Sequence, residues 1–383
     1  MTKKLRPLAR LLLESVTNIA GELPPGVVSI PVDQVVTTAF QHRVRPALWR
    51  RIRSAPSAPA AWRAALEAAR HGQLIRQMQA THDLGLICDA FATRGIRWAV
   101  AKGPVLSSVV WPHPDMREFG DLDLFVHPAD FAVALGELER LGAAYVDRNW
   151  PEIHRQGRAE LALRGPSGFA IDLHWDVTVS RAARRAFRAD LPAMLARRRV
   201  VGLTDELSVP TFDASDTLVH LAHHAAQSGA NRLVWLADVL HASDHAEVDW
   251  TKVSERAIQW GMGITAGLVL ARTERTFGVA LPLPVELRRA ASRSWCGILA
   301  AHRDRERPFP HLPDDPAASG IEYSSARRNN LFSLVAAIDQ WFEVRRTELR
   351  VRRHGPDDNP LDNPVDDPAA KADYLELVEA NAP

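Results

Sequence analysis

Two aspartates, Asp121 and Asp123, lie one residue apart in the otherwise apolar run DLDLFV. Successive residues of a β-strand point to opposite faces of a sheet, so this alternation predicts both carboxylates on one face and Leu122 and Leu124 on the other. Two carboxylates in an apolar strand are costly unless a positive charge neutralises them. A divalent cation, rather than a salt bridge, is the expected neutraliser, because Mg²⁺ prefers carboxylate oxygens.

The same alternation returns in the later run FAIDLHWDV, which predicts a strand with Asp172, His174 and Asp176 on one face. If this strand lies near the first one, Asp172 completes a cluster of three carboxylates. Three carboxylates around two Mg²⁺ ions, with Mn²⁺ as an alternative, match the demands of nucleotidyl transfer. There one ion activates the attacking hydroxyl and the other holds the triphosphate.

A turn suited to phosphate precedes the aspartates. Gly103 follows a predicted strand at 96–101, and a glycine there lets backbone N–H groups approach phosphate oxygens. Lys102 and Arg117 can supply positive charge to the same anion. The turn therefore predicts a triphosphate site beside the carboxylates.

Pro104 departs from this phosphate turn, because proline has no N–H to donate. Ser107 or Ser108, one turn further on, can take over the contact. The departure motivates an alternative interpretation, in which the chain binds a nucleotide or a partner without catalysing transfer.

Hydrophobic periodicity predicts an α+β chain with a small, mixed sheet. Strands are expected at DLDLFV, AAYVD, AELALRG and GFAIDLHWDV, after the short strand at 96–101, and a short extended piece is expected at ELSVPTF. Helices are expected at 5–22, 33–54, 59–95, 127–142, 181–199, 213–228, 231–245, 250–260, 263–277, 284–304 and 325–353, with a Pro-rich loop at 305–323. These elements suggest an N-terminal helical region at 1–79, a catalytic core at 80–180, a helical domain at 181–353 and a partly disordered acidic Pro/Asp-rich tail at 354–383.

Several short motifs of this chain occur together in one known protein family. In chain order they are Lys102-Gly103, Arg117, Asp121-Leu122-Asp123, Asp172-Leu173-His174-Trp175, the helix from His220 to His224, and RLVWLADV at 232–239. Together they resemble the uncharacterised nucleotidyltransferase family of the DNA polymerase β-like superfamily. The resemblance covers about residues 30–250, because QHRVRPALW at 41–49 also fits the family's N-terminal helices.

The resemblance implies a polymerase β-like core and a Mg²⁺-dependent transfer of a nucleoside monophosphate from a nucleoside triphosphate, with ATP weakly favoured. The acceptor would be a hydroxyl of a small molecule, a peptide or a protein. Implied metal ligands and catalytic residues are Asp121, Asp123 and Asp172. The implied triphosphate site contains Lys102, Gly103, Ser107 and Arg117, and the substrate contacts considered are His174, His223 and Asp238.

Other interpretations remain open at this point. An Asp-x-Asp pair alone can cap a helix or bind a stray cation. It also marks metal-dependent glycosyltransferases, which usually carry a larger nucleotide-binding α/β domain before the motif, whereas a helical region precedes it here. An antitoxin-like enzyme that adenylylates a partner protein is a further alternative.

The histidines at helical spacing, His220, His223 and His224, can suit a metal. A packed helix interior is the favoured interpretation, because no cysteine or acidic partner is fixed by the sequence. For Asp238, a structural pair with a histidine or an arginine is the simpler expectation.

Composition and the N-terminus limit the partners. The net charge is +1, and no aromatic platform accompanies the arginine-rich helices, so a nucleic-acid partner is not expected. The N-terminal apolar run is interrupted by Arg6, Pro7 and Arg10, which favours an amphipathic helix over a signal peptide. No run is long enough to suggest a membrane span. The two distant cysteines are expected to be reduced, and the cytoplasm is the expected compartment.

Overall fold

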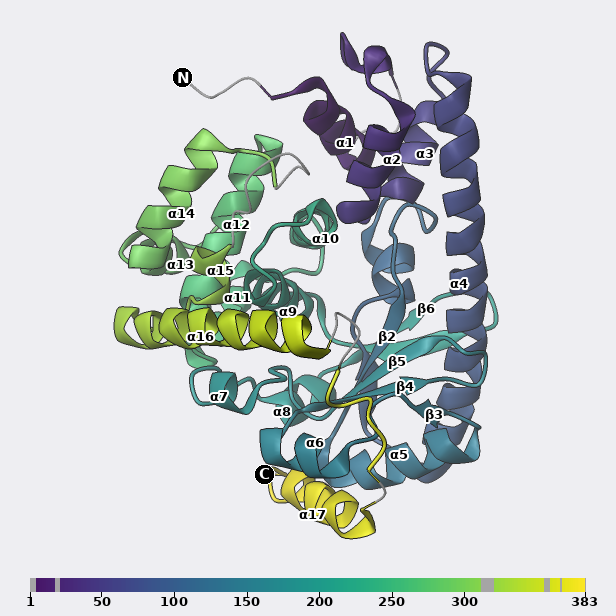
Figure 1. Cartoon of the computed structure of the whole chain (residues 1–383), viewed down its shortest axis with the longest axis vertical. Coiled ribbons are helices and arrows are strands. Elements are labelled where there is room, and N and C mark those ends of the chain that lie inside the picture. Colours follow the sequence, from purple (N-terminus) through teal and green to yellow (C-terminus); the bar gives the residue numbers. More distant parts are fainter. Residues whose placement is uncertain (1–4, 18–20, 311–319, 355–358, 366, 383) are drawn as a thin grey trace. The chain divides into compact units, whose positions relative to one another are not determined.

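The computed structural model describes residues 5–17, 21–310, 320–354, 359–365 and 367–382 (Figure 1). The chain forms two compact units, each assembled from three separate stretches. The sheet unit contains residues 78–105, 120–213 and 334–383, and the helical unit contains residues 1–77, 106–119 and 214–333. The four-part division expected from the sequence stays a prediction.

The sheet unit is built around a five-stranded sheet in the order β1-β2-β5-β4-β3. The strands are β1 (Trp98–Val100), β2 (Asp121–Val126), β3 (Ala144–Tyr145), β4 (Glu160–Arg164) and β5 (Ala170–His174). β2 and β5 run parallel, whereas the other neighbouring pairs are antiparallel. The expected α+β class with a small mixed sheet and flanking helices is confirmed.

The apolar faces of β2 and β5 form the core of this unit. Leu122, Leu124, Ile171 and Leu173 are completely buried, which is the outcome that the sequence alternation predicts for the face opposite the carboxylates. Burial of these four side chains holds the two strands in register and fixes which face carries the polar groups.

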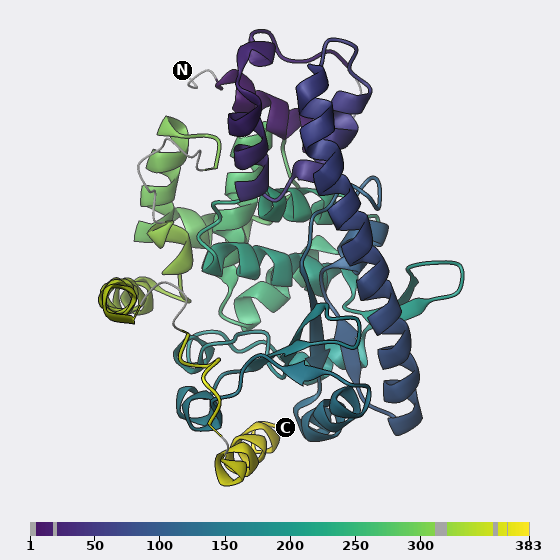
Figure 2. The same ribbon diagram turned by 45° about the vertical axis from the view of Figure 1, so that its right-hand side comes forward.

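Helices and a second, two-stranded sheet complete the sheet unit. Its helices are the C-terminal part of α4 (Ala60–Arg94), α5 (Phe131–Arg140), α6 (Trp150–Gln156), α7 (Arg181–Arg184), α8 (Leu191–Ala196), most of α16 (Asn330–His354) and α17 (Pro368–Glu379). The second sheet pairs β6 (Arg199–Gly202) with β7 (Ser208–Thr211), and this hairpin projects from the unit (Figure 2).

The predicted helix over 181–199 is wrong. Asp190 accepts a hydrogen bond from the Ala193 backbone N–H, and Pro192 occupies the first turn, so a new short helix begins there. The chain then leaves the helix and enters β6. α6 was not expected from the sequence, because it spans only two turns and starts at the capping side chain of Asn149.

The helical unit contains the remaining helices. They are α1 (Pro7–Thr17), α2 (Val32–Gln41), α3 (Arg45–Arg53), the first part of α4, α9 (Ala214–Gln227), α10 (Leu233–Ser243), α11 (Trp250–Gln259), α12 (Gly263–Phe277), α13 (Val285–Ser292), α14 (Trp295–Glu306) and α15 (Ile321–Ser324). None of the helices in the described part of the chain is both long and apolar enough to cross a membrane.

Two helices expected in this unit are each broken into two. The helix predicted at 33–54 stops before Arg43, whose left-handed backbone (φ 52°) interrupts the helical hydrogen bonds. The helix predicted at 284–304 is interrupted before Ser294, whose hydroxyl oxygen accepts a hydrogen bond from the Gly297 N–H and starts α14. α15 begins within the predicted loop at 305–323 and ends one residue beyond it, and residues 311–319 of that loop lie outside the described residues.

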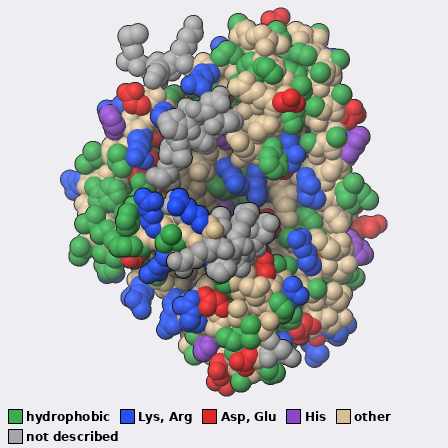
Figure 3. Space-filling view, viewed as in Figure 1, with side chains coloured by type: hydrophobic (Ala, Val, Ile, Leu, Met, Phe, Trp, Pro, Cys, Tyr) green, Lys and Arg blue, Asp and Glu red, His purple; other side chains and the backbone are tan. Residues whose placement is uncertain are grey.

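α16 carries an unusual concentration of exposed apolar side chains. Leu331 is 70% exposed and Trp341 is 54% exposed, and the arginines Arg345 and Arg346 that follow are exposed too. In Figure 3 hydrophobic side chains gather on the surface where α16 begins in Figure 1. Exposed apolar side chains therefore continue along this helix as far as Leu349, and exposed arginines join them in its second half.

Within the sheet unit, the C-terminal tail packs on the rest of the unit. The backbone N–H groups of Arg148 and Asn149 donate to the Leu361 carbonyl oxygen at 2.7 and 3.0 Å. α17 packs against α6, and the buried Tyr374 hydroxyl accepts a hydrogen bond from Trp175 Nε1 at 3.0 Å (Figure 1). The described part of the tail is thus attached to the segment that follows β5, while residues 355–358 and 366 lie outside the described residues.

We expect Tyr374→Phe to lower the free energy of unfolding by about 1 kcal/mol, because it removes one buried hydroxyl and keeps the ring. Trp175 Nε1 retains its second acceptor, the Arg158 carbonyl oxygen, at 3.0 Å. Urea denaturation followed by circular dichroism measures the change. Tyr145→Phe is the control, because that hydroxyl contacts an exposed glutamate, Glu139, and its loss should cost less. Equal stability of the two variants would contradict the prediction.

Candidate active site

The register of β2 and β5 brings two aspartates together. Asp123 lies directly opposite Asp172 in the parallel pair, and Asp121 lies opposite Ala170. Paired residues of neighbouring strands point to the same face, so Asp123 and Asp172 share the polar face of the sheet. The expected proximity of the two motif strands is therefore seen in the structure.

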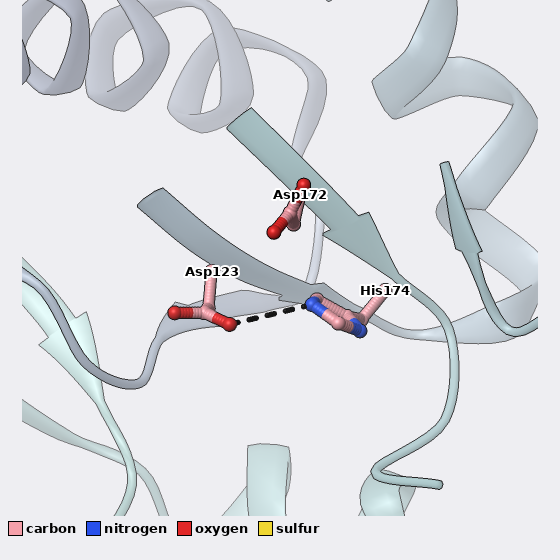
Figure 4. A group of neighbouring side chains, drawn as sticks. All are labelled: Asp123, Asp172 and His174. Carbon is pink, nitrogen blue, oxygen red and sulfur yellow. Dashed lines mark ion pairs between the residues drawn. The ribbon is translucent and has the colours of Figure 1, made fainter. Parts of the chain in front are cut away.

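Three side chains from these strands converge. One ligand atom from each of Asp123, Asp172 and His174 lies within 4.8 Å of the other two (Figure 4). The ring nitrogen Nε2 of His174 is 3.5 Å from Asp123 Oδ1, the contact drawn as a dashed line. Asp123 and His174 are buried, whereas Asp172 is half-buried. Asp121 is half-buried on the same strand and is not part of this group of three.

Lys102 forms a salt bridge with the cluster. Its Nζ lies 2.8 Å from Asp123 Oδ1, and the neighbouring Ala101 N–H donates to the Asp123 carbonyl oxygen at 3.1 Å. Lys102 therefore supplies one positive charge to Asp123, and the expected neutralisation of this carboxylate by a divalent cation stays a prediction. The lysine expected at a triphosphate instead contacts a candidate metal ligand.

The charges around Asp123 shift the titration of both partners. Burial alone would raise the pKa of Asp123, but the Lys102 ammonium and the His174 imidazole outweigh it and hold that pKa well below its usual range. Burial alone would lower the pKa of His174, but the carboxylates of Asp123 and Glu160 outweigh it, so this pKa is raised. Asp123 is therefore ionised, and positive charge beside it is favoured.

Asp172 lies in a more negative environment. Burial raises its pKa to about 7, and the negative charges of Glu160 and Asp123 contribute further in the same direction. A positively charged group beside Asp172 would relieve this repulsion. Asp176 follows the strand and accepts a hydrogen bond from the Thr178 N–H, while burial raises the pKa of Asp176 to about 6.

The cluster suits a divalent cation. Asp123 Oδ2 is buried and, among the described residues, accepts no hydrogen bond. An orphaned buried carboxylate oxygen is costly, and a cation is one group that can compensate it. With two carboxylates and one imidazole available within a small radius, Asp123, Asp172 and His174 are the residues that could hold such an ion.

The predicted phosphate turn lies next to this cluster in the chain. Gly103 has a left-handed backbone (φ 54°), a conformation that glycine adopts without strain. Helical residues begin at Pro104. Proline is favoured at a first helical position, where the missing N–H would have no partner within the helix, so Pro104 is compatible with the turn.

Four predicted site residues belong to the helical unit and are described with it. Arg117 donates to both carboxylate oxygens of Asp238, at 2.7 and 2.9 Å, and Trp111 Nε1 donates to Asp238 Oδ1 at 2.7 Å. Asp238 therefore has the structural arginine partner that was the simpler expectation. Ser107 is completely buried.

His223, the fourth of these residues, is buried on α9. Burial, with a smaller contribution from Arg327, lowers the pKa of His223 to about 3, so the imidazole is neutral near pH 7. Among the described residues, the α9 histidines do not belong to a group of three metal-type ligands. This agrees with the packed helix interior that the sequence favours.

Glu160 is a site residue that the sequence analysis missed. It lies on β4 opposite His174, and its Oε2 is 3.8 Å from His174 Nδ1. Its Oε1 accepts a hydrogen bond from Arg158 at 2.7 Å. The strand AELALRG was expected, but its register with β5 was unknown, and only that register places Glu160 beside His174.

A small mixed sheet that carries two carboxylates on adjacent parallel strands is the arrangement expected of a nucleotidyltransferase core. A sequence model of the family described as uncharacterised nucleotidyltransferase matches residues 29–278. The match covers more than half of the chain, so the chain belongs to this family. No curated protein matches the chain.

Proposed function

We propose that the protein transfers a nucleoside monophosphate from a nucleoside triphosphate to a hydroxyl acceptor, with Mg²⁺ as the cation. The pair Asp123 and Asp172, opposite each other on parallel strands, is the observation that carries this proposal. Family membership supports the class of reaction. The acceptor would be a small molecule, a peptide or a protein side chain.

The carboxylates would hold two cations, with Mn²⁺ as an alternative to Mg²⁺. Asp123 and Asp172 lie in the cluster, and Asp121 lies one residue away on the same face of β2. When bound, such cations polarise the phosphates and lower the pKa of the attacking hydroxyl. Asp172 would orient that hydroxyl, because it is the half-buried and therefore more accessible carboxylate of the cluster.

Lys102 and Gly103 would bind the triphosphate. The Lys102 ammonium is already next to Asp123, from which a short side-chain movement would bring it to a phosphate oxygen. The turn at Gly103 leaves room for close backbone approach. We include Ser107 and Arg117 in the triphosphate site, and His174, His223 and Asp238 among the substrate contacts, on the family resemblance alone.

A second candidate function is nucleotide or partner binding without transfer. The observation that favours it is the Lys102–Asp123 salt bridge, which neutralises a candidate metal ligand without any cation. In that case the chain would bind nucleotide yet leave it unchanged. A transferase that modifies a partner protein, as in antitoxin-like enzymes, differs from both only in its acceptor.

The test uses the full chain with ATP, GTP, CTP and UTP, each labelled on the α-phosphate, with Mg²⁺ or with EDTA. We expect nucleotide binding that requires the cation, and label transfer to a hydroxyl acceptor in a screen of small molecules, peptides and proteins. Asp123→Asn should abolish both, since it removes a charged ligand while keeping the side-chain shape. Asp89→Asn, an exposed position on α4, should change neither.

The outcomes separate the candidate functions. Cation-dependent binding with no transfer to any acceptor would favour the non-catalytic function. A label found on a co-purified protein would identify a protein acceptor. Nucleotide binding that is equal in Mg²⁺ and EDTA, or absent from both, would overturn the proposal.

A further inference from the structure

The imidazole of His174 is held in a defined orientation. Its ring stacks on Phe125, the residue opposite it in the parallel strand pair, with centroids 4.5 Å apart and planes inclined by 10°. Phe125 in turn packs against Phe212, with ring centroids 5.2 Å apart. Because rotation of the imidazole about its Cβ–Cγ bond would break the stack, the stack holds the plane of the ring.

Each ring nitrogen faces a carboxylate. Nε2 is 3.5 Å from Asp123 Oδ1, and Nδ1 is 3.8 Å from Glu160 Oε2. Both distances exceed a hydrogen bond, and neither nitrogen makes one with any described residue, although His174 is only 5% exposed. A buried imidazole with two unsatisfied nitrogens is costly, so this arrangement needs a compensating group.

We infer that His174 is a ligand of the divalent cation, binding it through Nε2 together with Asp123 and Asp172. This inference rests on the proposed function and deepens it, because a set of two carboxylates and one imidazole differs from a set of carboxylates alone. Asp123 Oδ1, the oxygen that Lys102 contacts, is also the one directed at His174, whereas the orphaned Oδ2 points away from Asp172 and His174 (Figure 4). An ion held by all three side chains would therefore bind at Oδ1 and displace Lys102 from it.

Glu160 has the position of a supporting group in this arrangement. A histidine that binds a metal through one nitrogen usually donates the N–H of the other to a carboxylate, which fixes the tautomer and the ring orientation. Glu160 stands at the Nδ1 side, and Arg158 holds its other oxygen at 2.7 Å. Glu160 is a positioning residue, since it acts on the cation through His174.

The donor set determines which cations fit. Mg²⁺ takes oxygen ligands almost exclusively, whereas Mn²⁺ and the later first-row ions also accept an imidazole nitrogen. The site should therefore bind Mn²⁺ more tightly than Mg²⁺. The difference should depend on His174 and not on the two aspartates, which serve both ions.

The experiment probes the full chain with Mn²⁺ alone. Pulsed electron paramagnetic resonance should show a ¹⁴N coupling from a directly bound imidazole in the wild type. The coupling should disappear in His174→Asn and persist in His82→Asn, which alters an exposed histidine on α4. Calorimetric titration should show Mn²⁺ affinity falling at least about tenfold in His174→Asn, with a smaller change for Mg²⁺.

A Glu160→Gln variant checks the positioning role. We expect it to keep the ¹⁴N coupling but to weaken Mn²⁺ binding, about tenfold, because the ring loses its charged partner. A merely structural role would leave Mn²⁺ affinity unchanged in the folded variant.

The loss of the coupling in His174→Asn assigns the imidazole to His174, and absence of ¹⁴N coupling in the wild type overturns the inference even if that variant fails to fold. If Mn²⁺ binds without ¹⁴N coupling and this binding is lost in Asp123→Asn, His174 is not a ligand of the ion. The proposed function is then unaffected. Absence of any Mn²⁺ or Mg²⁺ binding overturns both.

Discussion

Replacing Lys102 by methionine is expected to lower the free energy of unfolding by about 3 kcal/mol in metal-free buffer. Methionine keeps the length and apolar stem of the side chain, so the main change is the lost ammonium. Asp123 then remains buried with an unpaired charge, or takes up a proton at a cost, because its pKa is held low by Lys102 first among its neighbours. Urea denaturation in the presence of EDTA measures the loss.

Divalent cation should reverse much of this loss. A cation that binds the folded cluster stabilises the protein by mass action, and in Lys102→Met it also replaces the missing positive charge. We therefore expect Mn²⁺ to raise the melting temperature more in the variant than in the wild type. The matched control is Lys371→Met, whose partner Glu139 forms an exposed ion pair worth less than about 1 kcal/mol.

A double variant completes this test. Lys102→Met combined with Asp123→Asn removes both charges, so the combined loss should be smaller than the sum of the two single losses. If Lys102→Met unfolds at the same urea concentration as the wild type without metal, the salt bridge does not neutralise Asp123.

The carboxylate face could be predicted because it depends on local alternation. In DLDLFV and in FAIDLHWDV, the alternation within each run decides which side chains share a face of the sheet. The expected apolar side chains are buried: Leu122, Leu124, Ile171 and Leu173. The prediction that Asp172 joins the cluster was conditional on the two strands lying near each other, and their parallel pairing meets that condition. Those two facts place Asp123 against Asp172.

Partners that depend on register or on distant segments could not be predicted. Glu160 reaches His174 only because the turn closed by the Gly168 N–H and the Gly165 carbonyl sets the pairing of β4 with β5. Lys102 reaches Asp123 because Ala101 is hydrogen-bonded beside β2. Neither contact leaves a periodic signal in the sequence.

Helix ends were missed for a different reason. Arg43, Asp190 and Ser294 each stop or start a helix through backbone conformation or capping, while the apolar periodicity continues across them. Periodicity indicates which segments are helical, but a single capping side chain decides where one helix becomes two.

The other large effect is expected from Asp238→Asn, which should destabilise the folded protein by about 3–5 kcal/mol. Arg117 is 6% exposed and Asp238 is 1% exposed, so the variant would leave a guanidinium buried without its counter-charge. Trp111 Nε1 would also lose a charged acceptor at 2.7 Å. Thermal and urea unfolding at neutral pH measure the loss.

The matched control for Asp238→Asn is Asp115→Asn. Asp115 pairs with Arg50 at 2.9 Å, but both side chains are about a quarter exposed, so water can replace the lost charge and the cost should be about 1 kcal/mol or less. If Asp238→Asn also lowers the free energy of unfolding by only about 1 kcal/mol or less, the buried Arg117–Asp238 pair does not stabilise the fold as proposed.

The double variant Arg117→Met with Asp238→Leu separates pairing from packing. Replacing both members of a buried ion pair by apolar groups of similar size is often close to neutral, because no charge is left unpaired. The double variant should therefore recover most of the stability that Asp238→Asn loses. If it also retains cation-dependent nucleotide binding, Arg117 serves the fold rather than the triphosphate. If it folds but loses that binding, the arginine has both roles, and the family-based assignment of Arg117 gains direct support.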